Sequence, residues 1–430
     1  MKSIKGLITY WGQLFYLPVN ALAHLVPRDK NLWLFGSTFG RRFADNPRYF
    51  YSYICQHSIY ASGKIQRQML RHVSKGGSFI EDENCKLIRP VWISADKDLV
   101  EYLKEHGYPA CYSKSFKGKY YALRAGFYFY DNYSKDINYP LSGGAIKVNM
   151  WHGIPLKKIQ HDNIHDSYRH PENKLQKLRN IPRNISDEKP EDYVLTTSNN
   201  LRSTFSSAFK TDKVLTCGYP RVDSVKTDTI KCLLTPSEKI VKYKLSSMKK
   251  HHKGAKICLY IPTFRDSESK FFELVNMARL NAFLDDQNII LVVKAHMKSK
   301  LKEAFSRIEG ERVLTIPAND DVSRFMLDSD LLITDYSSAY FDYLWIDKPI
   351  VFFDYDLREY LSDSREMYYD YNTVTPGYKA SNLDELFEAV EDSLRFDIYK
   401  KERLALRKQM FDDDFETAST KLVEELSKLL

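Results

Sequence analysis

Short apolar runs recur along the chain and alternate with segments whose apolar residues have helical spacing. Such runs between helices are typical of buried strands in a mainly parallel sheet. The first half of the chain contains the predicted strands Leu32–Phe35, Leu87–Ile93, Tyr128–Tyr130, Ala145–Met150, Tyr193–Thr197 and Lys213–Thr216. The second half contains Ile257–Ile261, Ile289–Val293, Val313–Ile316, Leu331–Thr334 and Ile350–Phe353. The pattern therefore predicts an α/β protein with two Rossmann-like sheets.

A polar, lysine-rich stretch, residues 226–256, separates the two series of strands, and we interpret it as a basic linker. The 430 residues are enough for two domains of ordinary size. Predicted helices between the strands include Pro47–Ile59, Lys97–His106, Phe271–Leu284, Lys300–Ile308 and Val322–Leu327. The predicted division is an N-terminal segment 1–30, a first Rossmann-like domain 31–225, the linker 226–256, a second Rossmann-like domain 257–385 and C-terminal helices 386–430.

The composition favours anionic partners. The formal net charge is +8, and aromatic residues make up 14% of the chain. Nucleotides, phosphate polymers and acidic membrane surfaces fit such a chain. Nucleic acid is not expected, because the sequence has no zinc-finger spacing and no RNA-binding aromatic signature. The six cysteines are scattered without a Cys-x-x-Cys pair, which argues against disulfides or a cysteine-ligated metal and is consistent with a reducing cytoplasm.

Two segments predict contact with a membrane surface. The first has Lys2 and Lys5 followed by apolar residues at helical spacing, namely Ile4, Leu7, Ile8, Trp11, Leu14 and Phe15. This helix is expected to end near Pro18 after about 14 residues, which is too short to span a bilayer. Gln13 and Asn20 interrupt the apolar run and argue against a signal peptide. We expect a helix in the membrane interface; a helix packed on the first domain is the alternative.

The second segment, residues 157–183, carries seven Lys or Arg, three histidines and three acidic residues. We interpret it as a basic, partly helical excursion that faces a phosphate-rich acceptor or an anionic membrane. A solvated surface loop remains the alternative.

The segment Trp151–Lys158 follows the apolar run Ala145–Met150, so His152 is expected where a strand ends. Gly153 permits a tight turn, and Lys157 follows within a few residues. A histidine beside cationic residues at a strand's carboxyl end is placed to act as a base toward an anionic substrate. A loop histidine with solvated lysines is the simpler alternative.

The segment Leu331–Ser338 predicts a strand followed by a helix start. Ser337 or Ser338 is expected as the N-cap of that helix, in the turn Asp335-Tyr336-Ser337-Ser338. Backbone N–H groups and hydroxyls at a helix N-terminus favour a diphosphate. Ordinary capping explains the serines equally well.

Several segments in order resemble the CDP-glycerol-dependent glycerophosphotransferases of teichoic-acid and capsule synthesis. They are Phe35–Ser37 with Phe43–Tyr49, Trp151–Lys158, Gly218–Asp223, Tyr260–Asp266, Val293–His296, and Thr334–Ser338 continued through Phe341–Tyr343 to Pro349–Phe353 and Tyr355–Leu357. Met297 and Ile154 depart from the family pattern, which has proline and threonine there. The resemblance implies a GT-B-like fold, two Rossmann-like domains facing a central cleft, with C-terminal helices. It also implies a transferase that moves polyol phosphate from a CDP-polyol to a lipid-linked or polymeric acceptor and releases CMP.

Residue roles follow from that chemistry. We expect His152 to be the general base and His296 to assist departure of CMP. The diphosphate is assigned to Ser337, Ser338, Asp335 and Arg265, although Arg265 also suits an ion pair with Asp266 or Asp342. Asp45 and Asn46 are expected to bind acceptor hydroxyls or to cap a helix, and Gly153 and Lys157 to bind substrate. Arg221 and Asp223 are expected to line the cleft.

The resemblance further implies no cofactor and no tightly bound metal. The N-terminal helix and the excursion 157–183 predict a peripheral location on the cytoplasmic face of the cell membrane. Glycerol and ribitol remain open as the polyol. A GT-B glycosyltransferase that uses a nucleotide sugar and a catalytically silent polymer-binding scaffold are the alternative functions.

Overall fold

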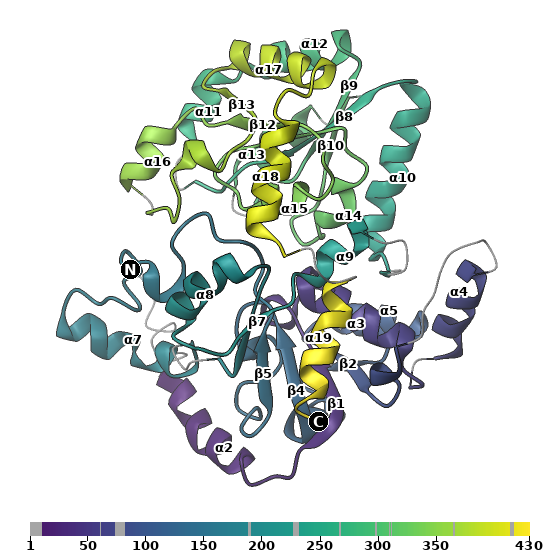
Figure 1. Ribbon diagram of the computed structural model, residues 1–430, viewed down its shortest axis with the longest axis vertical. Helices are drawn as coiled ribbons and strands as arrows, with labels where there is room; N and C mark the ends of the chain where they lie inside the picture. Colours follow the sequence, from purple (N-terminus) through teal and green to yellow (C-terminus); the bar gives the residue numbers. More distant parts are fainter. Residues whose placement is uncertain are drawn as a thin grey trace. The chain divides into compact units, whose positions relative to one another are not determined.

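The computed structural model describes residues 11–60, 62–73, 82–187, 191–226, 232–265, 268–296, 299–308, 310, 312–363, 366–412 and 417–430. The chain forms two compact units, shown with the sequence colouring in Figure 1. Unit 1 comprises Met1–His152, Ile159–Leu233 and Phe411–Leu430, and unit 2 comprises Gly153–Lys158 and Leu234–Met410. The boundary at His152 places the predicted base at the end of a unit 1 segment, with Gly153 and Lys157 in unit 2.

Unit 1 is built on a seven-stranded sheet in the order β3-β2-β1-β4-β5-β6-β7, and its strand pairs are parallel. The strands are β1 Asp29–Phe35, β2 Arg89–Ser94, β3 Ala110–Tyr112, β4 Ala125–Tyr130, β5 Ile146–Asn149, β6 Tyr193–Thr196 and β7 Val214–Thr216. All residues of β4 are buried. A parallel sheet covered on both faces favours such continuous apolar runs over alternating ones.

Most helices of unit 1 lie between these strands in the sequence. The helices of unit 1 are α2 Tyr16–Ala23, α3 Asp45–His57, α4 Gly63–Val73, α5 Lys97–Glu105, α6 Phe116–Arg124, α7 Lys174–Asp187, α8 Arg202–Phe209, α9 Pro220–Lys226 and α19 Ala418–Ser427, with short 3-10 helices η1 Gly12–Phe15, η2 Thr38–Gly40, η3 Glu83–Cys85, η4 Ser134–Asp136, η5 Gln160–Asp162 and η6 Asn199–Leu201. Helix α3 is almost entirely buried, and its Arg48 has no exposed surface. The last helix, α19, is fixed to α9 because Asp223 accepts hydrogen bonds from the backbone N–H groups of Ala418 and Ser419.

Unit 2 has a six-stranded parallel sheet in the order β10-β9-β8-β11-β12-β13. The strands are β8 Lys256–Ile261, β9 Ile289–Val293, β10 Val313–Thr315, β11 Leu331–Thr334, β12 Ile350–Phe353 and β13 Tyr378–Ala380. The helices are α10 Pro236–His251, α11 Ser269–Leu274, α12 Met277–Asp286, α13 Leu301–Arg307, α14 Ser323–Met326, α15 Ala339–Tyr343, α16 Leu357–Asp363, α17 Leu383–Arg395 and α18 Lys400–Met410, with η7 Tyr371–Thr373.

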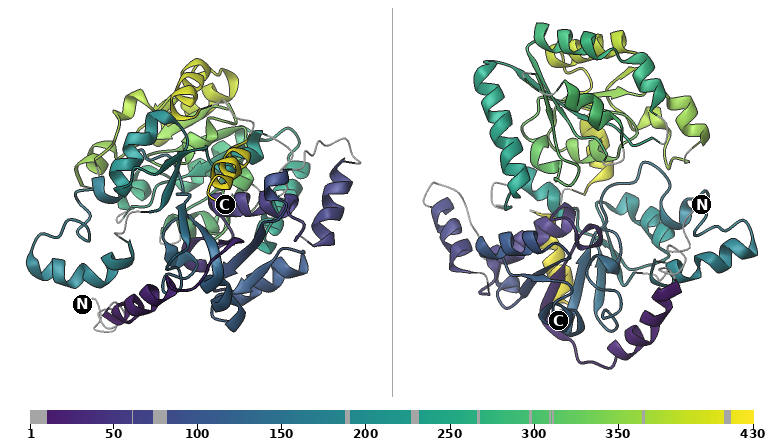
Figure 2. Two further views of the ribbon diagram at one scale, coloured as in Figure 1. Left: turned by 60° about the horizontal axis from the view of Figure 1, so that its bottom comes forward. Right: turned by 180° about the vertical axis from the view of Figure 1, so that it is seen from behind.

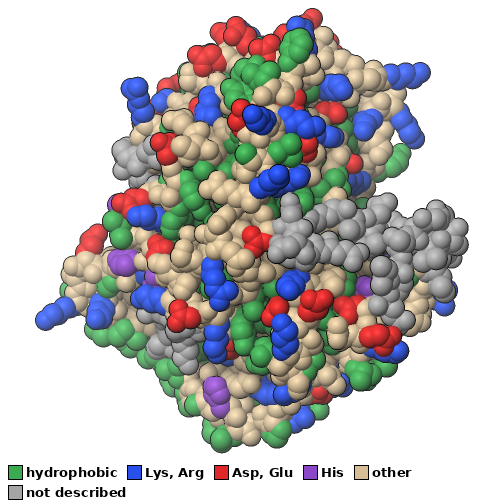
Figure 3. All heavy atoms as spheres, in the orientation of Figure 1, with side chains coloured by type: hydrophobic (Ala, Val, Ile, Leu, Met, Phe, Trp, Pro, Cys, Tyr) green, Lys and Arg blue, Asp and Glu red, His purple; other side chains and the backbone are tan. Residues whose placement is uncertain are grey.

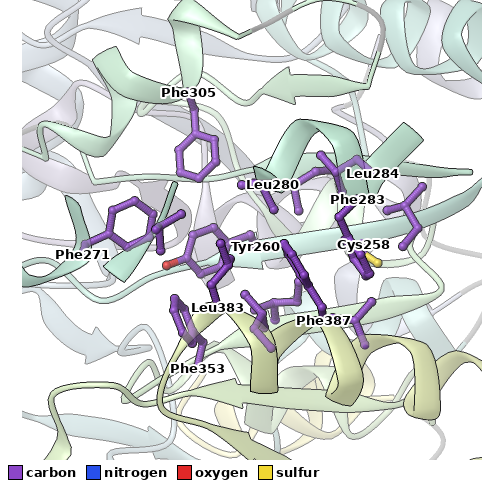
Figure 4. Close-up of a pocket in the computed structure, with 16 residues that line it drawn as sticks. Cys258, Tyr260, Phe271, Leu280, Phe283, Leu284, Phe305, Phe353, Leu383 and Phe387 are labelled. Carbon is purple, nitrogen blue, oxygen red and sulfur yellow. The ribbon is translucent and has the colours of Figure 1, made fainter. Parts of the chain in front are cut away.

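The core of unit 2 encloses a small apolar cavity. Figure 4 shows Tyr260, Phe271 and Phe305 around it, with Leu383 and Phe387 of α17 below. Its volume is about 30 Å³, close to the volume of one water molecule. Because its lining is apolar and its volume so small, this cavity is a packing gap and is excluded as a nucleotide site.

Several predicted boundaries differ from the structure. The stretch predicted as a linker is largely helix α10, which belongs to unit 2. Thr235 and Glu238 form a capping box at its start, Pro236 occupies the first turn, and the basic residues 249–251 lie in its last turn; these features stabilise a helix. The predicted helix 271–284 is divided into α11 and α12, because Asn276 caps a new helix start.

The N-terminal and C-terminal segments also differ from prediction. The predicted helix falls partly on residues 1–10, which lie outside the described residues. Helix α2 runs through Pro18 instead of ending there; proline is tolerated in the first turn, where its missing N–H is not needed. At the other end, the predicted C-terminal helices fall in both units, with α17 and α18 in unit 2 and α19 in unit 1. Within the described residues, no helix is both long and apolar enough to cross a bilayer.

Candidate functional site

In unit 1, polar side chains gather at the carboxyl ends of three neighbouring strands. Ser37 follows β1, Asp131 follows β4 and His152 follows β5, and these strands are adjacent in the sheet. Carboxyl ends of parallel strands meet at one edge, which is where α/β proteins bind ligands. The backbone at this edge is strained: Trp151 has a φ of 50°, Asp45 of 62° and Phe39 of 56°. Such values are costly for residues with side chains and concentrate at functional sites.

Asn46 fixes the backbone that carries His152. The amide Nδ2 of Asn46 donates to the carbonyl oxygens of Met150, at 3.1 Å, and of Trp151, at 3.0 Å. Its Oδ1 accepts from the N–H of Arg221 at 3.3 Å. Asn46 has no exposed surface, so it holds the histidine loop instead of presenting its amide to an acceptor hydroxyl as predicted.

Arg221 and Asp45 complete this support. The guanidinium of Arg221 donates to the carbonyl oxygen of His152 at 2.9 Å and forms an ion pair with Asp45 at 2.5 Å. The Arg221 side chain is buried, whereas Asp45 is half-buried. Asp45 begins helix α3, where a carboxylate is stabilised by the helix dipole.

The imidazole of His152 is exposed and oriented by a main-chain contact. Its Nδ1 lies 3.0 Å from the carbonyl oxygen of Asp131. Since a carbonyl oxygen can only accept, Nδ1 carries the proton and Nε2 carries the lone pair. The ring also lies against Trp151, with ring centroids 4.0 Å apart. This is the tautomer that a general base requires if Nε2 faces the substrate.

The side chain of Asp131 is buried and hydrogen-bonded on several sides. It accepts from the hydroxyl of Ser37 at 2.7 Å, from the N–H of Thr38 at 3.2 Å, and from Nδ2 of Asn132 at 3.0 Å. The carboxyl group of Asp136, also buried, accepts from the backbone N–H groups of Phe39 at 2.7 Å and Asn132 at 3.1 Å. Burial, with repulsion by neighbouring carboxylates, raises the pKa of both.

A further acid, the half-buried Glu191, also supports the histidine loop. Glu191 accepts from the hydroxyl of Tyr130 and from Nδ2 of Asn149, the latter at 3.2 Å. Asn149 in turn accepts from the N–H of Trp151 at 2.9 Å. Burial raises the pKa of Glu191 to about 7, so this carboxyl group titrates near neutral pH.

In unit 2, a buried ion-pair network lies at the carboxyl ends of β8 and β11. The guanidinium of Arg265 donates to Asp335 at 2.8 Å and forms a two-pronged pair with Asp356, one contact of which is 2.8 Å. Asp335 also accepts from the N–H of Thr263 through both oxygens at 3.0 Å. The planar fork of Arg265 is therefore engaged by Asp356 instead of a phosphate, and the ion-pair partners are Asp335 and Asp356 instead of Asp342. Asp266, the other predicted partner, lies outside the described residues.

His296, Ser337 and Ser338 lie at the same edge of the unit 2 sheet, after strands β9 and β11, which both pair with β8. His296 is exposed, and its ring centroid is 4.9 Å from that of Phe264. Both serines are partly exposed. Ser338 is the N-cap of α15 by position, but its side chain makes no capping hydrogen bond, whereas Ser337 Oγ accepts from the N–H of Ala339 at 3.4 Å.

The segment Gly153–Lys158 is anchored within unit 2. Lys157 Nζ donates to the hydroxyl of Tyr360 at 2.7 Å and lies 5.2 Å from the centroid of its ring. The N–H of Lys158 donates to the carbonyl oxygen of Glu366 at 2.8 Å, and the N–H of Tyr368 donates to that of Leu156 at 3.0 Å. Gly153 is buried at the start of this segment.

The part of the chain described above contains no group of three or more His, Cys, Asp or Glu side chains suited to a metal ion. All six cysteines are buried free thiols. The residues that the sequence reasoning missed are Asp131, Asp136, Asn149 and Glu191. Asp131 directly follows the predicted strand Tyr128–Tyr130, so the strand-end rule that identified His152 was also sufficient to find it.

Comparisons with known proteins agree with this architecture. The sequence is 27% identical to a teichoic acid poly(glycerol phosphate) polymerase of Bacillus spizizenii over 92% of both chains. It is 28% identical to a teichoic acid glycerol-phosphate transferase of Staphylococcus aureus over 84% of both chains. The solved structure of the wall teichoic acid polymerase TagF has a TM-score of 0.65 at 20% identity and covers 98% of both chains. An S. aureus MnaA–UDP structure shares the fold with a TM-score of 0.51 at 11% identity, covering 93% of this chain and 97% of that one.

These structural neighbours support the predicted fold class, with two Rossmann-like domains. The sequence profile of the CDP-glycerol:poly(glycerophosphate) glycerophosphotransferases matches residues 19–428, nearly the whole length. The chain belongs to the CDP-glycerol:poly(glycerophosphate) glycerophosphotransferase family.

Proposed function

We propose that this protein transfers polyol phosphate, with glycerol phosphate as the first candidate, from a CDP-polyol to a hydroxyl group of a growing cell-surface polymer. Family membership over nearly the whole chain supports the reaction class. Relatives named for both glycerol-phosphate and ribitol-phosphate transfer support a CDP-polyol donor and a teichoic-acid-like acceptor. The single structural observation that carries the proposal is the exposed His152, whose Nδ1 is tied to a main-chain carbonyl.

In this reaction an acceptor hydroxyl oxygen attacks the phosphorus that bears the polyol. A new oxygen–phosphorus bond forms, the bond to the CMP oxygen breaks, and CMP leaves. His152 Nε2 takes the proton of the attacking hydroxyl. Phosphoryl transfer depends mainly on positioning and on neutralising oxygen charge, so the remaining residues act on the diphosphate and on the loop geometry.

We assign the donor diphosphate to unit 2. His296 donates to a phosphate oxygen and assists the departure of CMP, while the hydroxyls of Ser337 and Ser338 hold the diphosphate. Arg265 and Asp335 act indirectly, because their mutual pairing fixes the loops after β8 and β11 from which Phe264 and Ser337 extend. Gly153 and Lys157 belong to the segment Gly153–Lys158 of unit 2, to which Lys157 supplies positive charge.

We assign the acceptor to unit 1. Asp45 is the half-buried carboxylate beside the histidine loop and is placed to accept a hydrogen bond from a polyol hydroxyl. The guanidinium of Arg221 donates both to Asp45 and to the carbonyl oxygen of His152, and so fixes the position of these two residues relative to each other. The lipid-linked or polymeric nature of the acceptor follows from the family resemblance.

We further propose that unit 1 binds the cytoplasmic face of the cell membrane peripherally. Helix α7 packs against η1, and the two further views in Figure 2 draw α2 and α7 as neighbours. The exposed apolar side chains of these helices include Leu22 of α2 at 63%, and Leu175 at 80% and Leu178 at 52% of α7. Phe15, the last residue of η1, and Leu25, just after α2, are each 79% exposed. Basic residues of α7 accompany them, namely Lys174, Lys177 and Arg179, and Figure 3 shows blue basic beside green apolar side chains at this edge of unit 1. Apolar side chains flanked by basic ones favour the interface of an anionic membrane.

A donor panel tests the reaction class. The purified protein is incubated with an acceptor polymer and, separately, with CDP-glycerol, CDP-ribitol and UDP- or GDP-sugars, and the released nucleotide is identified by phosphorus NMR. CMP release with polyol phosphate in the polymer supports the proposal and names the polyol. UDP or GDP release with sugar transfer identifies a glycosyltransferase instead, and polymer binding without turnover of any donor identifies a scaffold.

A further inference from the structure

We propose that a polar cleft at one edge of the unit 1 sheet binds a phosphate-bearing unit of the acceptor chain, separate from the unit that reacts beside His152. This inference rests on the proposed function, in which the acceptor is a polyol phosphate polymer. The cleft is lined by the edge strand β7, by η6 with the first residue of α8, and by the last helix, α19; Figure 1 labels β7, α8 and α19.

The cleft has the size and the lining of a small-ligand site. Its volume is about 450 Å³, within the range of about 300–1,000 Å³ that such sites occupy. The polar lining consists of two cations, two carboxylates, an amide and a hydroxyl, namely Arg202, Lys421, Asp412, Glu425, Asn199 and Thr216. A polyol phosphate unit carries a charged phosphate and hydroxyl groups, so this lining offers a partner to each of its polar parts.

Both carboxylates of the cleft have donors at ordinary hydrogen-bonding distances. Asp412 accepts from the backbone N–H of Asn199 at 3.0 Å and from its side-chain Nδ2 at 2.9 Å. Glu425 forms an ion pair with Lys428 at 2.8 Å. The two acids are therefore engaged within the protein.

The two cations of the cleft, in contrast, make only long side-chain contacts with the residues that the structure describes. The guanidinium of Arg202 donates to the carbonyl oxygen of Asp212 at 3.5 Å, beyond the usual range of about 2.7–3.2 Å. Lys421 Nζ lies 3.9 Å from Glu424 and 3.8 Å from Glu425. Guanidinium and ammonium groups carry several N–H donors each, and both bind phosphate oxygens well. The binding capacity that remains in the cleft is therefore for an anion.

A hydroxyl in the cleft wall also lacks a partner in the described part of the chain. The Oγ1 atom of Thr216 is buried and has no hydrogen bond there. Buried polar atoms are normally paired with protein, water or ligand. A ligand hydroxyl or phosphate oxygen in the cleft supplies the partner that the protein does not.

The cleft lies toward the same edge of the sheet as His152. Asn199 comes after β6, Thr216 is the last residue of β7, and His152 comes after β5. These three strands are consecutive in the sheet, so β5 and β7 are two strand spacings apart, about 10 Å. A chain whose terminal hydroxyl reaches His152 can therefore place an earlier phosphate near Arg202 and Lys421. The cleft would hold the growing polymer while its end reacts.

The test measures how tightly the full-length protein binds short polyol phosphate oligomers, by calorimetric titration without donor. Arg202→Gln combined with Lys421→Gln removes both charges, and we expect the oligomers to bind at least about tenfold more weakly. The KM for oligomeric acceptors is expected to rise by the same factor. The affinity for CDP-glycerol is expected to stay at the wild-type value, because the donor is assigned to unit 2.

The matched control combines Lys117→Gln with Lys119→Gln. Both lysines are exposed on α6, which follows β3, the strand at the opposite edge of the sheet. The control removes the same number of charges and so reports the general electrostatic attraction of a polyanion. Equal oligomer affinity in wild type and in the folded Arg202/Lys421 variant overturns the proposal, as does an equal loss of affinity in the control.

Two further arms keep the proposal falsifiable. If the Arg202/Lys421 variant does not fold, Thr216→Val replaces it, since valine keeps the shape and removes the hydroxyl; unchanged oligomer affinity then contradicts the proposal. Unchanged oligomer affinity with lost binding to anionic vesicles identifies a lipid head-group site instead. If the wild-type protein turns over no CDP-polyol, the proposed function itself fails. Normal turnover with an oligomer affinity that the Arg202/Lys421 variant leaves unchanged refutes only the role of the cleft.

Discussion

The imidazole Nδ1 of His152 and the main-chain carbonyl oxygen of Asp131 are 3.0 Å apart. This one contact selects the tautomer, and therefore decides which nitrogen can accept a proton. The contact depends on two strands, β4 and β5, that pair in register over Phe127–Tyr130 and Ile146–Asn149. The sheet thus determines the chemistry of a residue that lies in a loop.

The ion-pair network of Arg265 predicts a large effect on stability. Arg265→Ala leaves Asp335 and Asp356 as buried carboxylates without their guanidinium partner. We expect unit 2 to be destabilised by about 3–5 kcal/mol, measured by thermal or urea unfolding. Arg279→Ala is the matched control, because its pair with Asp384 is exposed and is expected to contribute less than about 1 kcal/mol. Similar losses in the two variants would contradict the structural role of Arg265.

Ser337 and Ser338 predict a donor-specific effect. The combined change Ser337→Ala and Ser338→Ala removes two hydroxyls at the edge that carries His296. We expect CDP-polyol to bind at least about tenfold more weakly, since even one lost hydrogen bond to a charged group costs about 1.5–3 kcal/mol and about 1.4 kcal/mol is tenfold in affinity. Calorimetric titration with CDP-glycerol measures this directly. The control replaces Ser246 and Ser247, which are exposed on α10. Unchanged donor affinity in the Ser337/Ser338 variant would remove these serines from the donor site.

The raised pKa of Glu191 predicts that the stability of the folded protein depends on pH. Its pKa in the folded protein is raised from 4.5 to about 7, so between these values the folded state binds more protons than the unfolded state. The free energy of unfolding therefore decreases as the pH rises from 4.5 to about 7, because Glu191 loses its proton in the unfolded state at a lower pH than in the folded state. Glu191→Gln carries no charge at any pH. We expect its melting temperature to exceed that of wild type increasingly from pH 5 to pH 8, and a constant difference across that range would show that Glu191 is ionised throughout.

The apolar side chains of α2 and α7 predict peripheral membrane binding. The variant Leu22→Asp with Leu175→Asp places charge within the exposed apolar surface and is expected to bind anionic vesicles at least about tenfold more weakly in sedimentation assays at low salt. High salt should release part of the wild-type protein, because α7 contributes basic residues. Ile240→Asp, on an exposed face of α10, is the control. The proposed membrane-binding surface would be contradicted if all three proteins sediment equally with the vesicles, or if the wild-type protein does not sediment with them.

Much of the fold could be predicted from the sequence. Strands β9, β11 and β12 begin and end at the predicted residues, because each is a continuous apolar run between polar flanks. Strands β3 and β13 were missed. Each has three residues at a sheet edge, and Ala110–Tyr112 and Tyr378–Ala380 lack the adjacent Val and Leu residues by which the equally short edge strands β7 and β10 were predicted. The prediction of a linker was wrong. The many charged residues of α10 suggested a linker, although the capping box of Thr235 and Glu238 marks the start of a helix there.

The candidate site could be predicted only in part. The rule that ligands bind at strand carboxyl ends placed His152, His296 and Ser337 correctly after β5, β9 and β11. The partners of these residues could not be found in the same way. Asn46 contacts Met150 across 104 residues of sequence, and Arg265 contacts Asp356 across 91. Such pairs arise from strand order and loop packing, which local pattern does not encode.

The most direct measurement is the rate of polyol phosphate transfer from CDP-glycerol by His152→Ala and His296→Ala, each shown by circular dichroism to be folded. Loss of a general base or of a phosphate donor typically costs about 10²–10⁴-fold in rate. His251→Ala, an exposed histidine of α10, is the control and should turn over normally. We predict that both site variants lose at least about a hundredfold in kcat. Turnover by folded His152→Ala within a few-fold of wild type would contradict the account.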